Sequence, residues 1–310
     1  MRALDELIEK ASEKALNVRF LQNEPMKNHT TFQIGGPADL MAVPQDKESF
    51  LGLMDLVKDC PVPALVVGNG SNLLVSDDGI EGIVVKTEEA LDKISLCGEH
   101  AVLAGAGATL SRLSSFCRDH ALSGLEFAHG IPGTVGGAVC MNAGAYGGEM
   151  SDVVEKTEYY KGKTVLSLSG RDHCFSYRHS FFSDRGDLVV LSSAFLLKPA
   201  KKEDISAKIA DLANRRREKQ PLNLPSAGSV FKRPEGCFAG KLIEDAGLRG
   251  FSINGAEVSE KHAGFIVNRG GATCNDVLAL IDLIQKTVYR KFSVELECEI
   301  KIVGRCSGSA

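Results

Sequence analysis

Two short loops of the sequence combine glycine with small polar residues in a way that suits phosphate binding. The loop Gly68–Asn72 reads Gly-Asn-Gly-Ser-Asn and follows the apolar run Ala64–Val67. Glycine permits a positive φ and a close backbone approach, so such a loop can present several N–H groups to a pyrophosphate. The Rossmann pattern is excluded, because it needs a third glycine where Leu73 stands and a helix directly after it. The loop Gly105–Leu110 fails the same test, and a plain glycine turn stays the alternative for both loops.

A longer glycine-rich segment, Gly130–Gly148, is more distinctive. It holds seven glycines and almost no charge, and apolar residues are interleaved throughout. A merely flexible linker would be polar. We therefore expect this segment to lie buried against a flat ligand, with a purely structural loop as the alternative.

Single polar residues elsewhere have types that suit catalysis, but the residues alone leave their roles open. Arg178 stands among aromatic residues, where it is either a fixed cation for a carboxylate or a surface residue. Ser229 ends a turn of small residues without the Gly-x-Ser-x-Gly elbow of a hydrolase, which favours a capping or turn serine. Glu295, Glu297 and Glu299 share one face at period two, and three such carboxylates usually form a solvated face. Periodicity does not choose among them.

The spacing of apolar residues predicts the elements that carry these segments. Helical spacing with proline and charge signals at the ends predicts four long helices. Strict alternation over 294–302 predicts a half-buried terminal strand. We expect short helices in the first 25 residues, helices over about 47–60, 110–120, 201–220 and 275–291, and strands over 64–67, 82–86, 101–104, 187–191 and 294–302.

Composition limits the classes of protein to which the chain can belong. Its 310 residues suffice for two or three domains, and 44% hydrophobic with 25% charged residues is ordinary for a globular protein. The net charge of −4 favours neither nucleic acid nor a membrane surface as a partner. The nine cysteines lack zinc-type spacing, so we expect reduced thiols, no metal site and a cytoplasmic location. We expect no signal peptide and no membrane span, since no apolar stretch reaches 18 residues.

Taken together, these segments resemble the MurB family of UDP-N-acetylenolpyruvoylglucosamine reductases. The resemblance extends from Asn28 to Gly304, and its strength lies in many modest motifs that occur in one order. The motifs are Asn28–Ala38, Gly68–Leu74, Gly124–Glu126, Gly130–Gly137, Asn142–Gly147, Ser176–Arg178, Ser226–Lys232 and Leu296–Ile300.

The resemblance implies an α+β fold with two parts. A FAD-binding domain of the vanillyl-alcohol-oxidase (PCMH) type, built from two subdomains, is followed by an α/β substrate-binding domain. It further implies non-covalent FAD, NADPH as the reductant, a small-molecule UDP-sugar substrate and no obligate protein partner. The expected borders are N-terminal helices over 1–30, the FAD domain over 31–199 with subdomains of about 31–86 and 87–199, the substrate domain over 200–304, and a tail over 305–310.

Three catalytic roles follow from the resemblance by position. Arg178 matches the arginine of the Ser-Tyr-Arg motif, Ser229 the proton-donor serine, and Glu299 the glutamate of the final strand. We expect the three to meet around one reacting carbon beside the flavin ring. The resemblance also assigns flavin contacts to Gly68, Asn69, Gly70, Ser71, Asn72, Gly130, Ile131, Pro132, Gly133, Thr134, Gly136, Gly137 and Ala143, while Tyr177, Lys232, Arg233 and His262 are candidates for holding the substrate.

One departure from the family pattern and two alternative functions stay open. The strand beginning at Leu188 follows Phe182 within six residues, so the chain resembles the shorter class of the family, which lacks an inserted tyrosine loop. How the nucleotide end is held is therefore less defined. The alternatives are another flavin oxidoreductase of the same superfamily, or a nucleotide-sugar-binding regulator that has lost catalysis.

Overall fold

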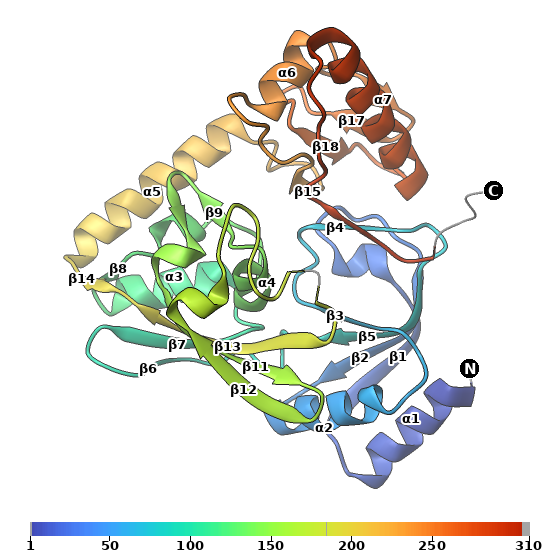
Figure 1. The fold of residues 1–310 in the computed structure, drawn as a ribbon, viewed down its shortest axis with the longest axis vertical. Coiled ribbons are helices and arrows are strands. Elements are labelled where there is room, and N and C mark those ends of the chain that lie inside the picture. The colour runs from blue at the N-terminus through green and yellow to red at the C-terminus, as the bar shows by residue number, and fades with distance from the viewer. Residues whose placement is uncertain (1, 184, 306–310) are drawn as a thin grey trace. The chain divides into compact units, whose positions relative to one another are not determined.

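The computed structural model describes residues 2–183 and 185–305, and the chain divides into two compact units (Figure 1). The first unit comprises Met1–Gln22, Leu40–Asn69 and Gly82–Arg215. The second comprises Asn23–Asp39, Gly70–Glu81 and Arg216–Ala310. Neither unit is one continuous segment, and the domain borders expected from the sequence stay a prediction.

The first unit contains a four-stranded sheet with the strand order β1-β2-β5-β3, whose core also receives two helices. Helix α2 buries Phe50, Leu53 and Val57 at helical spacing. Asp46 caps this helix by accepting a hydrogen bond from the Ser49 amide at 2.7 Å. Strands β3 and β5 run parallel, so their carboxyl ends lie at the same edge. The bounds are α1 Arg2–Glu13, β1 Val18–Pro25, β2 Pro37–Pro44, α2 Lys47–Lys58, β3 Ala64–Val67 and β5 Ile80–Lys86.

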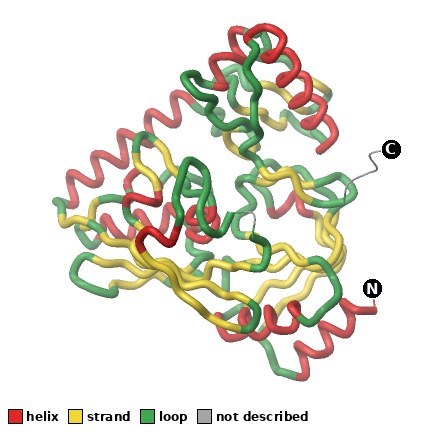
Figure 2. The backbone as a smooth tube through the Cα atoms, in the orientation of Figure 1, coloured by secondary structure: helices red, strands yellow, loops and turns green. Residues whose placement is uncertain are grey.

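The first unit also contains a five-stranded antiparallel sheet with the strand order β12-β11-β13-β7-β6 (Figure 2). Helix α3 buries Leu110, Leu113 and Cys117, and α4 contacts β13 and β7. The bounds are β6 Ile94–Leu96, β7 Ala101–Gly105, α3 Leu110–Asp119, β8 Leu122–Ser123, η2 Glu126–Ala128, α4 Val135–Cys140, β9 Gly144–Ala145, β10 Gly148–Glu149, η3 Met150–Asp152, β11 Val154–Lys161, β12 Thr164–Ser169, η4 Gly170–His173, β13 Leu188–Leu196, β14 Lys198–Pro199 and α5 Lys202–Lys219.

The second unit combines a four-stranded antiparallel sheet, β15-β18-β17-β16, with the parallel pair β4–β19. Thr273 begins α7 with a capping box. The Asp77 carboxylate accepts hydrogen bonds from the amides of Cys274 and Asn275 at 2.7 and 3.0 Å, which complements the helix dipole. The bounds are η1 Met26–His29, β4 Leu73–Val75, β15 Ser226–Ser229, α6 Ala239–Asp245, β16 Ser252–Ile253, β17 Ala256–Val258, β18 Phe265–Asn268, α7 Cys274–Phe292 and β19 Lys301–Val303.

The helices α2, α3, α5 and α7 confirm the sequence predictions to within two residues at each end. Within the described ranges, no helix is both long and apolar enough to cross a membrane. The expectation of helices throughout the first 25 residues was wrong after α1, because Val18–Pro25 forms an edge strand beside β2.

The terminal strand expected over 294–302 was also wrong in extent. Leu296 and Ile300 are buried while Glu295 and Glu297 are exposed, so the side chains alternate as the sequence indicates. The backbone, however, pairs only at Cys298, with Phe231, and again from Lys301. Apolar and polar side chains therefore alternate because one side of this extended segment is buried, although the segment forms no continuous ladder of backbone hydrogen bonds. Of the predicted tail, only Arg305 lies among the described residues, and its guanidinium contacts Asp39 at 2.5 Å.

Candidate active site

Two of the predicted flavin loops lie against each other in the first unit. The side-chain amide of Asn69 donates a hydrogen bond to the carbonyl of Pro132 at 2.5 Å. A Cβ added to Gly68 would stand 2.2 Å from Thr134 Oγ1, which is far below any ordinary contact. Only glycine at position 68 allows this approach, because any side chain there would push the loops apart.

The glycine-rich segment Gly130–Gly148 contains a short helix that the sequence did not reveal. Helix α4 begins at Val135, and the amide of Gly136 donates to the Ala106 carbonyl at 2.8 Å. A Cβ on Gly136 would stand 2.9 Å from the Cβ of Ala106. The segment from Gly105 therefore packs beneath the helix, which supports its interpretation as a structural turn. Glycine and β-branched residues have low helix propensity, so α4 gave no helical signal in the sequence.

The remaining part of the first loop belongs to the second unit. Gly70 has φ +59°, and a Cβ there would stand 2.3 Å from the His29 carbonyl oxygen. The side-chain amide of Asn72 donates to the Glu299 carbonyl at 3.1 Å, and the Asn72 carbonyl accepts from the Lys301 amide at 2.8 Å. The loop is thereby bound to the C-terminal segment on both sides of residue 300. Sequence reasoning missed this role of Asn72, because nothing in the local pattern indicates a partner 227 positions away.

Ser229 and Glu299 are brought onto adjoining backbone. Ser229 ends β15, where it is paired with Phe265 of β18. The Glu299 amide donates to the carbonyl of Val230, the next residue, at 2.7 Å. Cys298 forms a bridge with Phe231 one step further along. The structure thus places two of the three predicted catalytic residues on adjoining backbone segments of the second unit, Ser229 at the end of β15 and Glu299 before β19.

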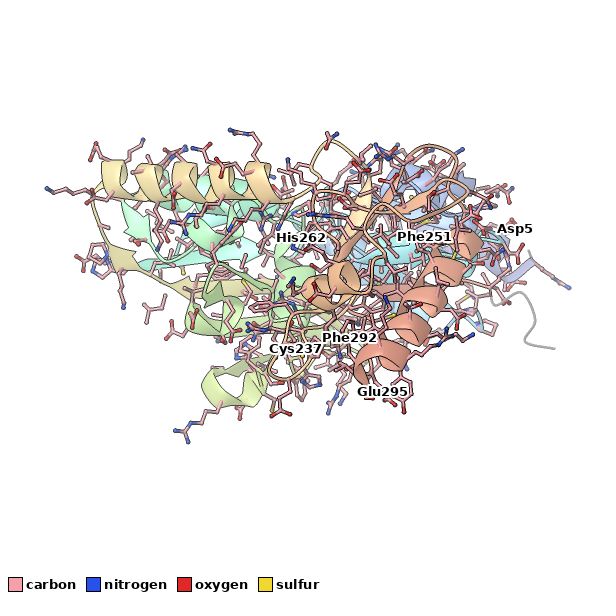
Figure 3. The ribbon with its side chains drawn as sticks, turned by 90° about the horizontal axis from the view of Figure 1, so that it is seen from above. Asp5, Cys237, Phe251, His262, Phe292 and Glu295 are labelled. Carbon is pink, nitrogen blue, oxygen red and sulfur yellow. The ribbon has the colours of Figure 1, made fainter. Side chains whose placement is uncertain are left out.

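Burial distinguishes the three glutamates that periodicity could not separate. Glu295 and Glu297 are exposed, whereas Glu299 is only partly exposed. The carboxylate of Glu297 forms an ion pair with the ammonium of Lys232. Glu299 is therefore the one of the three that is withdrawn from the solvated face, and this agrees with the choice that the family resemblance makes. Figure 3 labels Glu295, which lies beyond the carboxyl end of α7.

Arg178, the third predicted catalytic residue, lies in the first unit in a strained turn. Its φ of +55° is uncommon for a residue with a side chain. Its Nη2 donates to the Gly144 carbonyl at 3.2 Å. The buried side chain of Asn142 fixes the turn by donating to the Ser176 carbonyl at 3.0 Å, and Ser180 Oγ donates to the Cys140 carbonyl at 2.8 Å. Strain held by such a network is typical of functional turns. Ala143, a predicted flavin residue, lies directly between these anchors in the chain.

The predicted substrate-holding residues occupy several places. Tyr177 is half exposed, and the Arg178 guanidinium lies 5.2 Å from the centroid of its ring. Arg233 stacks on Phe238 at 3.9 Å, close to the Lys232–Glu297 ion pair in sequence. His262, labelled in Figure 3, accepts a hydrogen bond from the Gly264 amide at 3.1 Å. Burial lowers the pKa of His262, and Arg249 acts in the same direction.

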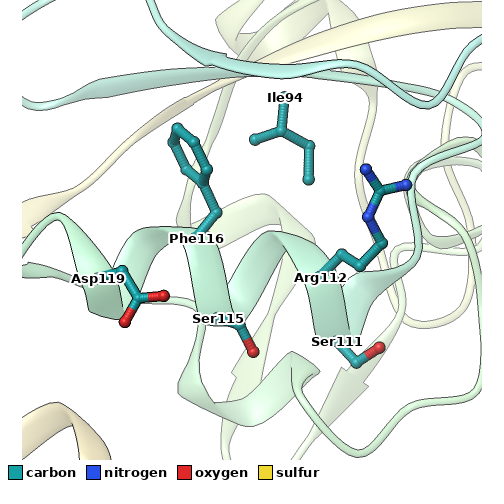
Figure 4. A pocket seen from close by; sticks show the side chains of 6 residues that line it. All are labelled: Ile94, Ser111, Arg112, Ser115, Phe116 and Asp119. Carbon is teal, nitrogen blue, oxygen red and sulfur yellow. The ribbon is translucent and has the colours of Figure 1, made fainter.

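A surface hollow of about 400 Å³ lies in the first unit along α3 (Figure 4). Phe116 and Ile94 form its apolar side, and Arg112 and Asp119 lie at its margin. Arg112 is paired with Asp92 at 2.8 Å. None of the predicted site residues lines this hollow, so it does not bear on their chemistry.

The cradle in the first unit fits a flavin dinucleotide. The Thr134 side chain lies so close to Gly68 that no Cβ fits there, and the Asn69 side-chain amide donates to the Pro132 carbonyl. Glycine-rich loops of this kind can present main-chain N–H groups to a pyrophosphate. An FAD binding domain model matches residues 38–165, and a model of the UDP-N-acetylenolpyruvoylglucosamine reductase C-terminal domain matches residues 220–303. A relative of that name from Caldanaerobacter subterraneus is 51% identical over 96% of this chain and 98% of the relative.

The chain belongs to the MurB family. A second MurB relative, from Agathobacter rectalis, is 48% identical over 96% of this chain and 98% of its own length. The crystal structure of MurB from Thermus caldophilus is 33% identical with a TM-score of 0.78, covering 93% of this chain and 99% of that one. These comparisons confirm the family resemblance, the α+β fold class and the FAD-binding domain that the sequence predicted. The roles of the individual MurB site residues stay predictions.

Proposed function

We propose that this chain reduces UDP-N-acetylglucosamine enolpyruvate to UDP-N-acetylmuramate, with FAD as cofactor and NADPH as reductant, in peptidoglycan precursor synthesis. Family membership over nearly the whole chain supports the reaction, and the FAD-binding domain supports the cofactor. The observation that carries the proposal is the adjoining backbone of Ser229 and Glu299, bound through Asn72 to a predicted flavin loop. When bound, reduced FAD supplies the hydride that adds to the methylene carbon of the enolpyruvyl group.

Arg178 is proposed to bind the substrate carboxylate. Addition of hydride to the methylene carbon places negative charge on C2, from which it spreads into the carboxylate. A cation fixed in advance stabilises such developing charge most effectively. The planar guanidinium can pair with both carboxylate oxygens, and the turn that holds Arg178 is fixed by the buried Asn142.

Ser229 is proposed to deliver the proton to C2. A hydroxyl is a weak acid, but a carbanion is basic enough to accept its proton, and such general-acid steps contribute about 10²–10⁴-fold. Glu299 in its protonated form would donate a further hydrogen bond to the charge that develops at the carboxylate. The hydrogen bond from the Glu299 amide to the carbonyl of Val230, the residue after Ser229, supports a common task.

The nucleotide end of the substrate is proposed to be held by Tyr177, Lys232, Arg233 and His262. Their exposed or half-buried polar groups suit a diphosphate and a base. We also propose that the enzyme works in the cytoplasm, without an obligate protein partner. The described cysteines are all free thiols, as a reducing compartment would keep them.

The replacement Ser229→Ala tests the assigned chemistry by separating the two half-reactions. Reduction of the flavin by NADPH should stay nearly intact, while reoxidation by the enolpyruvyl substrate should slow by about 10³-fold or more. Stopped-flow absorbance of the flavin measures both rates. Ser226→Ala on the same strand is the matched control, because Ser226 makes its recorded contacts with Thr31 through the backbone.

Equal losses in both half-reactions of Ser229→Ala would contradict the proton-donor role. Failure of the enolpyruvyl substrate to reoxidise the wild-type flavin would instead favour another flavin oxidoreductase of the superfamily. A colourless wild-type protein that still bound the nucleotide sugar would favour a regulator. The purified protein should be yellow and should lose its colour on unfolding, because the flavin is not covalently attached.

A further inference from the structure

We propose that Lys86 is a positioning residue for the cofactor, and that its buried ammonium fixes the Gly68 peptide against which the FAD pyrophosphate binds. The inference rests on the proposed use of FAD and adds a residue outside the motifs that carry the family resemblance. Lys86 ends β5, and in the parallel pairing it lies beside Val67, which ends β3. Ligands of parallel sheets bind beyond the carboxyl ends of the strands.

The contacts of the Lys86 side chain lead directly to the loop. Its Nζ donates a hydrogen bond to the Gly68 carbonyl at 2.6 Å and lies 3.2 Å from a carboxylate oxygen of Glu88. The Lys86 side chain is only 5% exposed, whereas that of Glu88 is 35% exposed. A charge-assisted hydrogen bond of this kind is about twice as strong as a neutral one.

The Gly68 carbonyl and the Asn69 amide belong to the same peptide group. An ammonium on the carbonyl oxygen polarises that group and makes the N–H a stronger donor, as occurs in chains of hydrogen bonds. The other side of the same loop is fixed by Thr134 and Pro132. Lys86 thus orients and polarises the first N–H group of a loop that is suited to a pyrophosphate.

Stability alone does not account for a lysine at this position. The preceding residues of β5, Ile83, Val84 and Val85, are fully buried and apolar. Burying an ammonium is costly, and replacing a buried ion pair by an apolar side chain of similar volume is often neutral or stabilising. Methionine at position 86 would therefore continue the apolar strand at little cost, which makes it the informative replacement.

The test compares FAD binding by the wild-type protein, Lys86→Met, Lys86→Gln and Lys93→Met. FAD is titrated into each apoprotein, and the dissociation constant is obtained from quenching of flavin fluorescence. Lys86→Met should raise the dissociation constant about tenfold or more with an unchanged or higher melting temperature of the apoprotein. Lys86→Gln keeps a hydrogen-bond donor without the charge, so its dissociation constant should lie between those of the wild type and Lys86→Met. Lys93→Met, at an exposed lysine of the same unit, should bind like the wild type.

The pH dependence separates a charge from a merely structural side chain. Burial lowers the pKa of Lys86 below 10.5, while Glu88, the charged group recorded against it, acts in the opposite direction. The wild-type dissociation constant should therefore rise with increasing pH on the alkaline side, and this rise should be smaller in Lys86→Met.

Unchanged FAD affinity in Lys86→Met would overturn the inference, and so would a loss of affinity matched by a lower apoprotein melting temperature. Parallel pH profiles of the two proteins would overturn it as well. Wild-type protein that binds no FAD at all would instead refute the proposed function, so the two failures are distinguishable.

Discussion

The predicted flavin loops of the first unit and the segments of the second unit that carry Ser229 and Glu299 are built on different physical principles. In the first unit, Gly68 and Gly136 hold positions at which an added side chain would overlap its neighbours, so the close packing there requires glycine. In the second unit, Ser229 and Glu299 are ordinary residues placed by hydrogen bonds between segments far apart in the chain. The first arrangement depends on the type of residue, and the second depends on pairing.

This difference determines what a mutation would do. A side chain added to the glycine loops acts through steric overlap, so the loss appears in folding and cofactor affinity together. A change in the paired segments leaves their side chains intact and shifts them, so the loss appears in the rate of the reaction. Four replacements test this distinction, from the largest expected effect to the smallest.

Gly68→Ala should give the largest effect. Its Cβ would stand 2.2 Å from Thr134 Oγ1, and overpacking of this kind costs about 1–3 kcal/mol. We expect a lower apoprotein melting temperature and FAD affinity reduced about tenfold to hundredfold. Gly137→Ala is the matched control, because its Cβ would meet Thr134 at an ordinary 3.8 Å within helix α4. That change should raise the melting temperature, and equal destabilisation by both would break the comparison.

Asp77→Ala should destabilise the second unit without touching its chemistry. Asp77 accepts hydrogen bonds from two amides at the N-terminus of α7, and loss of such a cap costs about 0.5–2 kcal/mol. Unfolding in urea measures the change. Asp282→Ala, an exposed i,i+4 partner of Lys286 on the same helix, should cost no more than about 0.5 kcal/mol. A similar cost for both would show that Asp77 has no special role.

Asn72→Ala sharpens the comparison at the point where the loop joins the segment that carries Glu299. The Asn72 amide donates to the Glu299 carbonyl, so its loss should displace Glu299 and lower kcat about tenfold. FAD affinity should change by less than that. Single-turnover reoxidation and flavin titration measure the two effects. A larger loss in FAD affinity than in kcat would assign the Asn72 side chain to the cofactor instead.

The smallest effect is a pH dependence in the first unit. His173 is fully buried, and burial lowers its pKa below 6.5, although the Gly170 carbonyl and Asp172 oppose the shift. The unfolded chain then binds more protons, so stability is complete above pH 6.5 and is lost as the pH falls toward the folded pKa. Urea unfolding between pH 5 and 8 should show a slope of at most about 1.4 kcal/mol per pH unit from this residue. His173→Gln should reduce the slope, and an unchanged slope in this variant would contradict the assignment to His173.

The same distinction explains what the sequence could predict. Periodicity predicted α7, because its apolar residues repeat at helical spacing, and a continuous apolar run predicted the strand Ala64–Val67. Glycine content marked the predicted flavin loops, because close backbone approach and positive φ favour glycine. Neither signal exists for Glu299, which differs from Glu297 in being partly buried. Only the family resemblance singled it out.

Other features were missed for reasons that are local. Helix α4 is short and rich in glycine, so propensity and periodicity both argued against it. The strand β1 alternates weakly and was mistaken for a helix. The link from Asn72 to Glu299 depends on tertiary structure that no window of sequence contains.

The parallel pairing of β19 with β4 has a consequence for synthesis of the chain. Phe32, Ile34 and Leu74 belong to a core whose other members all lie at residue 227 or beyond. On the ribosome these early apolar side chains must therefore wait for most of the polypeptide to emerge before they find their partners. Long-range closure of this kind slows folding, and the exposed interval is when association with chaperones or other nascent chains competes with it.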